Sequence, residues 1–189
     1  MPETTPPLPD LAGLSLAEIM ALVEAKKLPP VDKWNPSHCG DSHMRIARDG
    51  TWYHEGSPIG RPAMVRLFAT VLRREADGSH VLVTPVEKLS IEVEDAAFRA
   101  VEVRSEGEGR ARRLAFRLDS GDIVVAGPEH GLRIAETDDG PQPYLRARGG
   151  LEARLLRPVF YELAEIAIAE DADPPGVWSD GVFLGLGAA

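Results

Sequence analysis

The sequence has little that would suit an oxidising or membrane environment. Cys39 is the single cysteine among 189 residues, so the chain cannot form an internal disulfide bond. No uninterrupted apolar run reaches about 18 residues, the length that a membrane-spanning helix needs. Residues 1–10 contain neither the basic segment nor the apolar core of a secretory signal. We therefore expect a cytoplasmic protein without a membrane segment.

Basic residues are also in short supply. The chain has 21 Lys and Arg against 30 Asp and Glu, which gives a formal net charge of −9. This excess of negative charge repels a phosphate backbone, so we expect no nucleic-acid partner. Apolar residues make up 43% of the chain, a normal value for a globular protein.

Motifs for cofactors and metals are missing as well. No glycine-rich loop has the spacing of a phosphate-binding motif, and we expect no cofactor. His38, Cys39 and His43 could supply nitrogen and sulfur ligands together with His54, but their spacing matches no closed zinc site. We therefore predict no metal.

One segment invites comparison with a hydrolase. In Gly40-Asp41-Ser42-His43 a serine follows a Gly-Asp pair, as in a family of serine hydrolases. That chemistry also needs a histidine base, which this family places in an Asp-x-x-His motif near the C-terminus, and the last histidine, His130, has no such motif. An Asx or Ser turn before the first strand explains the same residues.

A pattern does recur, in the same order, in the two halves of the chain. The first half contains Arg45-Ile46-Ala47, Asp49-Gly50, Trp52-Tyr53 and Arg61-Pro62. The second half contains Arg133-Ile134-Ala135, Asp139-Gly140, Tyr144 and Arg157-Pro158. Matches that keep their order while their spacing drifts indicate a duplicated unit.

The hydrophobic periodicity predicts the elements of these units. Residues 1–30 are predicted to form a Pro-rich arm and an amphipathic helix, with Ser15 and Glu18 as a capping box. Short strands then occur in groups, and helices are predicted over 62–73 and from Arg157 to about Ala169. The apolar stripe of the first predicted helix consists of Leu16, Ile19, Met20 and Val23. Strands are predicted over 45–47, 51–54, 81–83, 89–93, 101–103, 114–118, 123–125, 132–134 and 144–147.

Grouped strands favour an α+β fold over a βαβ fold. We predict two small related domains with repeated strand-hairpin-helix motifs and mainly antiparallel sheets. The first domain covers 31–91, and the second covers 92–189 and includes a C-terminal tail that folds back.

Candidate site residues lie at helix starts and strand ends. Arg61 and Arg157 each begin a helix, where free N–H groups and a guanidinium fork suit an anion, although each could instead pair with a local acid such as Asp49 or Glu152. Thr84, Glu87 and Lys88 follow a buried strand, where sites often form. Trp34, Trp52 and Tyr53 would add aromatic contact area.

Longer stretches of the chain resemble a known family. These are Cys39-Gly40-Asp41-Ser42, Arg45-Ile46, Asp49-Gly50-Thr51-Trp52, Gly56-Ser57-Pro58-Ile59, Thr84-Pro85-Val86-Glu87-Lys88 and Leu151-Glu152-Ala153-Arg154. Together they resemble the signature of a bacterial family known as domain of unknown function 1285, over about residues 31–165. The resemblance implies a two-domain α+β fold with repeated motifs, no established activity, and a role that has been considered to lie in signal transduction or ligand sensing.

We therefore expect a ligand-binding or regulatory protein that binds a small anionic ligand between two related domains. One alternative is a small cofactor-free enzyme that uses Glu87 as a general acid or base, beside Lys88 or His54. Another is a protein-interaction scaffold, and the sequence leaves a protein partner or a homo-oligomer open.

Overall fold

The computed structural model describes residues 28–187 together with residues 15, 17, 18, 21 and 25. The chain forms two compact units. The N-terminal unit consists of residues 28–97 with 149–151, and the C-terminal unit contains 98–148 and 152–187. The division follows Ala97, beyond the boundary predicted at residue 91, because β6 (Glu87–Val93) is a full strand of the N-terminal sheet.

Little of the first 27 residues is described. The predicted capping box is confirmed, since the Ser15 N–H donates to Glu18 Oε2 at 2.8 Å and the Glu18 N–H donates to Ser15 Oγ at 3.3 Å. The predicted stripe of Leu16, Ile19, Met20 and Val23 lies outside the described residues. Among the described helices, none combines the length and apolar character needed to cross a lipid bilayer.

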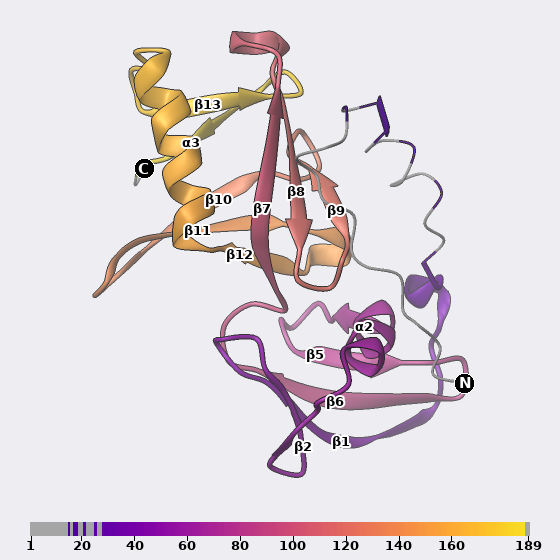
Figure 1. Ribbon diagram of the computed structural model, residues 1–189. Helices are drawn as coiled ribbons and strands as arrows, with labels where there is room; N and C mark the ends of the chain where they lie inside the picture. The colour runs from indigo at the N-terminus through magenta and orange to yellow at the C-terminus, as the bar shows by residue number, and fades with distance from the viewer. Residues whose placement is uncertain (1–14, 16, 19–20, 22–24, 26–27, 188–189) are drawn as a thin grey trace. The chain divides into compact units, whose positions relative to one another are not determined.

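The N-terminal unit is built on one six-stranded sheet (Figure 1). The strand order is β3-β2-β1-β6-β5-β4, with β1 and β6 parallel and the other neighbours antiparallel. Its other elements are η2 (Val31–Lys33), β1 (His38–Ile46), β2 (Trp52–His54), β3 (Ser57–Pro58), α2 (Pro62–Thr70), β4 (Leu72–Arg74) and β5 (His80–Val83).

Local sequence explains the turns and helix of this unit. The predicted hairpin at Asp49-Gly50 joins β1 to β2, and Gly50 has a φ of 90°, which glycine adopts without strain. Pro62 occupies the first turn of α2, where its missing N–H costs nothing. The helix prediction to residue 73 was too long, because Leu72 pairs with Leu82 in the sheet.

The C-terminal unit also has a six-stranded sheet, in the order β10-β11-β12-β7-β8-β9. Only β12 and β7 are parallel within this sheet. The elements are β7 (Phe98–Glu106), η3 (Gly109–Ala111), β8 (Arg113–Leu118), β9 (Ile123–Val125), β10 (Leu132–Thr137), β11 (Gly140–Arg146), η4 (Arg148–Gly150), β12 (Glu152–Leu155), α3 (Arg157–Ala169), β13 (Gly176–Ser179) and β14 (Val182–Gly185).

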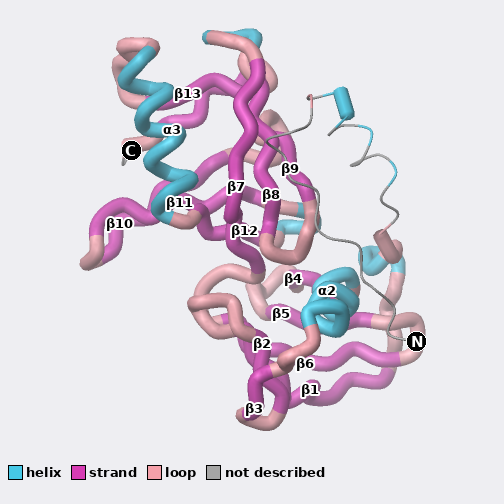
Figure 2. Tube along the Cα trace, viewed as in Figure 1, coloured by secondary structure: helices cyan, strands magenta, loops and turns pink. Residues whose placement is uncertain are grey.

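Helix α3 and the tail complete the C-terminal unit. Helix α3 has the bounds expected from the sequence and packs on β7 and β13. The predicted return of the tail is seen as the hairpin β13–β14, in which Val177 and Leu184 are buried. Strands make up most of both units (Figure 2), so the predicted α+β class with mainly antiparallel sheets is confirmed.

The two units share one strand order. Counting strands along the chain within each unit, the order across both sheets is third, second, first, sixth, fifth, fourth. In both, the first and sixth strands are the parallel pair at the centre. The repeat seen in the sequence pairs different strands from this structural repeat. It relates β1–β2, which lie toward the centre of the N-terminal sheet, to β10–β11, which lie at the edge of the C-terminal sheet.

Candidate functional site

The two faces of the N-terminal sheet differ in what covers them. Trp52 and Ile46 are paired neighbours on one face, and Phe68 of α2 stacks on Trp52 with ring centroids 6.4 Å apart. Helix α2 therefore covers this inner face. Residues that alternate with these, such as Arg45 and Tyr53, lie on the opposite face, which we call the outer face.

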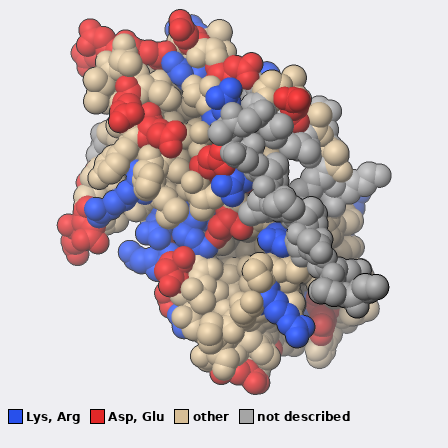
Figure 3. Space-filling model, viewed as in Figure 1, with Lys and Arg blue, Asp and Glu red and all other residues tan. Residues whose placement is uncertain are grey.

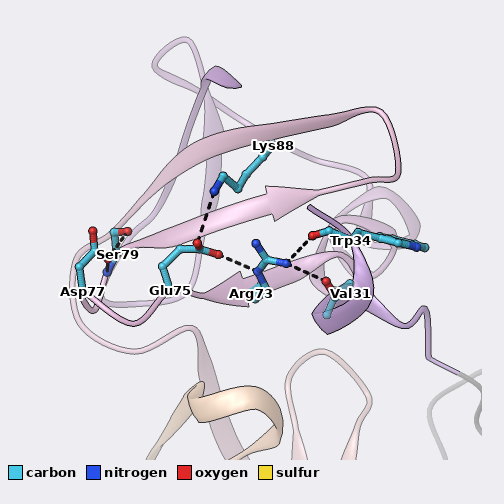
Figure 4. A network of polar contacts seen from close by, with 7 residues as sticks. All are labelled: Val31, Trp34, Arg73, Glu75, Asp77, Ser79 and Lys88. Carbon is cyan, nitrogen blue, oxygen red and sulfur yellow. Dashed lines mark hydrogen bonds and ion pairs between the residues drawn. The ribbon is translucent and has the colours of Figure 1, made fainter. Parts of the chain in front are cut away.

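Half of the outer face is covered by the segment around η2. Val31 and Trp34 pack on Val81 and Val83 of β5. Arg73 holds this segment in place, because Nη1 donates to the backbone oxygens of Val31 and Trp34, each at 2.8 Å (Figure 4).

The Arg73 guanidinium is itself fixed by an acid. Nε donates to Glu75 Oε1 at 2.6 Å, and Glu75 Oε2 lies 3.4 Å from Lys88 Nζ. The hydrogen bond from Arg73 holds the pKa of Glu75 below its ordinary value. This network ties β4, β6 and η2 together and has a structural role.

The other half of the outer face, over β2, β1 and β6, is open. Tyr53, Arg45 and Glu92 form a row of paired neighbours across these three strands. They line a cavity of about 510 Å³, to which Asp41, His43 and Ser90 also contribute polar groups. We call this cavity the N-terminal cavity.

A β-bulge shapes one end of the N-terminal cavity. The pairing of β1 with β6 shifts between Asp41 and Met44, so that Ser42 and His43 are extra residues. His43 has a φ of 55°, a conformation that non-glycine residues adopt at a cost. Such strain is common at functional sites, and here it turns the His43 side chain into the cavity lining.

Hydrogen bonds stabilise the bulge. Asp41 Oδ1 accepts the His43 N–H at 2.8 Å, and this bond holds the pKa of Asp41 below its ordinary value. The Ser42 hydroxyl donates to the Ser90 backbone oxygen at 2.6 Å and accepts the Met44 N–H at 3.1 Å. Ser42 is buried and fully bonded, so it is a structural residue within β1 rather than a nucleophile or a turn before the strand.

Arg45 is held in a defined orientation within the N-terminal cavity. Its guanidinium lies over the Tyr53 ring, 4.4 Å from the centroid, and Nη1 is bonded to Glu94 Oε1. Glu94 is anchored in turn by the Arg48 N–H, at 2.9 Å from Oε2. Because a guanidinium has five N–H donors, this arrangement leaves donors for a further acceptor.

The sequence predicted only part of this site. Tyr53 lines the N-terminal cavity, whereas Trp52 is a core residue with 4% exposure. Trp34 covers the other half of the outer face, and Lys88 belongs to the Glu75 network.

Thr84 and Glu87 shape the turn between β5 and β6. Thr84 Oγ1 accepts the N–H groups of Val86 and Glu87 at 3.3 and 3.2 Å. The Glu87 side chain is half-buried at the start of β6. These contacts show how the Thr-Pro-Val-Glu sequence closes a tight turn.

Arg61 and Arg157 begin α2 and α3, as predicted, and belong to different units. Neither helix has a side-chain cap or an acidic residue in its first turn. Within the described part of the chain neither arginine has an ion-pair partner. Glu152 instead binds Arg133, and Asp49 Oδ1 accepts the Thr51 N–H.

From the sequence, Asp41 and His43 were considered only for hydrolase or zinc chemistry, and Arg45, Ser90 and Glu92 were assigned to no site, although all five line the N-terminal cavity. The alternation of Ser90 and Glu92 with Ile91 and Val93 was a usable signal, since it marks a strand with one polar face. The bulge carries no comparable signal. Over the described residues, no three His, Cys, Asp or Glu side chains are grouped to hold a metal ion.

Comparison with known proteins identifies the family. Residues 29–96 match "Domain of unknown function (DUF1285), N-terminal domain", and residues 97–186 match "Protein of unknown function (DUF1285), C-terminal domain". These two matches divide the chain next to the observed junction of the units.

Solved structures agree with this result. A DUF1285 family protein from Silicibacter pomeroyi DSS-3 is 45% identical, with a TM-score of 0.77, over 88% of this chain and 93% of that one. A DUF1285 family protein from Shewanella baltica OS155 is 25% identical, with a TM-score of 0.52, over 65% of this chain and 91% of that one. No curated protein matches the chain. Two domain matches that together span nearly all of the described sequence place this chain in the DUF1285 family.

Proposed function

We propose that the protein is a ligand-binding, regulatory protein whose N-terminal cavity takes up a small polar molecule with an anionic group. The observation that carries this proposal is the oriented guanidinium of Arg45, which lines the cavity, stacks on Tyr53 and is bonded to Glu94. An arginine that is already fixed loses little side-chain entropy when it binds a carboxylate or phosphate.

The other residues that line the N-terminal cavity restrict the kind of ligand that it can bind. Asp41 and Glu92 add two carboxylates to the same cavity, so a molecule with negative charge alone would be repelled. A ligand that also carries N–H or O–H donors would satisfy these carboxylates while its anionic group binds Arg45. The Tyr53 ring adds a flat apolar contact.

The volume of the N-terminal cavity, about 510 Å³, is typical of small-molecule sites. Arg61 and Arg157 stay predicted contacts for anionic groups, since their helix starts lack caps and acids. Neither arginine is among the residues that line the N-terminal cavity, so each is tested by a variant of its own.

The test is a thermal-shift screen of the full chain against small carboxylates and phosphates that carry amino or hydroxyl groups. A molecule that binds the native state raises the melting temperature by mass action. For a hit, calorimetry on Arg45→Gln should show a loss of about 1.5–3 kcal/mol, the worth of a hydrogen bond to a charged group.

Arg66→Gln is the matched control, because Arg66 lies within α2 and outside the N-terminal cavity. Arg61→Ala and Arg157→Ala test the two helix starts. If the affinity for the ligand is unchanged in both Arg45→Gln and Tyr53→Leu, the ligand does not bind in the N-terminal cavity and the proposal is wrong.

A catalytic function has one specific observation in its favour. His43 Nδ1 lies 3.6 Å from Asp41 Oδ2, which is beyond hydrogen-bond distance but places a carboxylate beside an imidazole, the group used most often as a general base. This pair favours His43 over Glu87 as the general base of an enzyme. Recovery of the bound ligand chemically unchanged after incubation supports simple binding, whereas conversion that is lost in His43→Asn supports an enzyme. Asparagine suits this test because it tolerates a positive φ.

A further inference from the structure

The C-terminal unit contains a second cavity, and none of its lining residues was discussed above as a ligand contact. It has a volume of about 800 Å³ and is bounded by the β13–β14 hairpin, the end of α3 and the loop at η3. Its side-chain lining includes Trp178, Phe183, Glu108, Glu170 and Asp173. We call it the C-terminal cavity.

The hairpin supplies an aromatic wall. Ser179 fixes the buried side of the hairpin, because its hydroxyl bonds to the Leu114 N–H and the Ala126 oxygen, at 2.9 and 2.7 Å. On the other side, Trp178 and Phe183 are directly paired, with ring centroids 5.3 Å apart in an edge-to-face arrangement. The two rings therefore occupy fixed positions.

Gly176 makes room for this wall. A Cβ atom at this position would lie 2.4 Å from Phe183 Cζ, so the Phe183 ring covers the glycine. The position of the Phe183 ring in this wall therefore requires glycine at residue 176.

The other walls are acidic. Asp and Glu side chains gather at the end of the C-terminal unit where α3 ends (Figure 3). Glu170 is ionised, because the Gly109 N–H and Arg112 hold its pKa below the ordinary value. Glu108 and Asp173 have no ion-pair partner within the described ranges, which leaves two carboxylates uncompensated.

The chain already places one of its own cations against this wall. The guanidinium of Arg110, in η3, lies 4.5 Å from the centroid of the Trp178 ring. Arg110 is exposed, and positive-φ glycines stand close by at 107 and 109. The face of the Trp178 ring therefore already binds a cation through a cation–π contact, and that cation is the exposed Arg110 side chain of a loop.

We infer that the C-terminal cavity binds a small organic cation, a molecule that ends in a guanidinium or alkylammonium group. The cation would lie against Trp178 and Phe183, with its charge next to Glu108 and Asp173, and would take the place of the Arg110 guanidinium. Aromatic faces beside carboxylates favour such cations, and the same charges repel anions. This inference concerns the C-terminal unit and is independent of the function proposed for the N-terminal cavity.

The test follows the indole N–H signal of Trp178 by NMR in the full chain, with Trp178→Phe to assign it. The probes are butylguanidinium and butylammonium chloride, and sodium butyrate at equal ionic strength serves as the anionic control. The two cations should shift this signal in a saturable way, and butyrate should not.

The variants make the test sharper. Arg110→Ala should tighten cation binding by about two- to fivefold, because it removes the competing guanidinium and one positive charge. Glu108→Gln combined with Asp173→Asn should weaken binding by a similar factor of about two to five. Asp171→Asn is the matched control, since Asp171 is a neighbouring exposed acid that does not line the C-terminal cavity.

Three results would overturn the inference. The first is a Trp178 signal that neither cation moves, and the second is an equal response to butyrate. The third is weaker cation binding in Arg110→Ala, since that would make the arginine a partner of the ligand rather than its competitor.

Discussion

The guanidinium carbon of Arg45 lies 4.4 Å from the centre of the Tyr53 ring, directly across the β1–β2 pair. Arg133 and Tyr144 repeat this relationship across β10–β11, also at 4.4 Å. Each arginine further binds a glutamate, Glu94 in the first case and Glu152 in the second. The same local arrangement thus occurs once in each unit.

Arg45→Leu should lower the free energy of unfolding by about 1 kcal/mol, because it removes a partly exposed ion pair and a cation–π contact. Urea unfolding measures this loss. In a double-mutant cycle with Tyr53→Leu, the coupling energy should be about 0.5–1 kcal/mol. A coupling energy of zero would mean that the stacked geometry contributes nothing to stability.

Arg73 should matter more. Arg73→Met removes the side-chain donor that the backbone oxygens of Val31 and Trp34 share, so the Val31 oxygen keeps only the Trp34 N–H, and it leaves Glu75 without its closest cation. Since Arg73 is 9% exposed, these losses should cost about 2–4 kcal/mol of unfolding free energy.

Hydrogen exchange gives the second readout for Arg73. Amides of residues 31–34 should lose protection in Arg73→Met, because the bonds to Val31 and Trp34 attach this segment to the sheet. Arg66→Met serves as the control and should leave their protection unchanged. Full protection of 31–34 in Arg73→Met would show that the Val31 and Trp34 packing is sufficient alone.

The sequence predicted strands and helices well where a local apolar pattern and a clear turn or helix start defined them. Ile123–Val125 and Arg157–Ala169 have the predicted bounds, because apolar periodicity and the Arg-Pro start define them locally. Strand β1 was expected to start near residue 44 but begins at His38, since its bulge interrupts the alternation. Strand β12 (Glu152–Leu155) was missed although its polar and apolar residues alternate, because only four residues carry the pattern.

The repeat illustrates the same limit. The residue matches identified two real hairpins with an Arg–Tyr contact, but strand order depends on pairing between distant segments. In the N-terminal unit α2 precedes β4, whereas α3 follows β12 in the C-terminal unit. A helix start that matches in sequence therefore need not hold the same place in the fold. The N-terminal cavity escaped prediction for a related reason, since β6 joins the predicted β1–β2 hairpin only through long-range pairing.

Gly176→Ala tests the aromatic wall of the C-terminal cavity. The added methyl group would lie 2.4 Å from Phe183 Cζ and 2.7 Å from the Leu184 oxygen. Overpacking of this kind should cost about 1–3 kcal/mol, measured by thermal unfolding. Phe183→Ala in the same chain should recover only part of that loss, because the contact with the backbone oxygen remains. Full stability of Gly176→Ala alone would show that the hairpin can shift freely.

Glu162 of α3 gives a prediction about pH. Glu162 is exposed on α3, but partial desolvation raises its pKa above the ordinary value, and the charges of Glu102 and Glu165 act in the same direction. The folded state therefore binds a proton more tightly than the unfolded state. By linkage, this group favours folding at low pH, and that contribution is lost as the pH rises from the unfolded pKa, about 4.3, through the folded value.

Glu162→Gln replaces the carboxylate by a neutral group of the same shape. The variant should melt at a higher temperature than the parent chain at about pH 7, where Glu162 is charged, and the difference should vanish near pH 3.5, where both states are protonated. Glu129→Gln, an exposed acid without a partner among the described residues, is the control for a general change in net charge. If both variants gain equally at pH 7, the effect comes from net charge, and the local repulsion around Glu162 is not its cause.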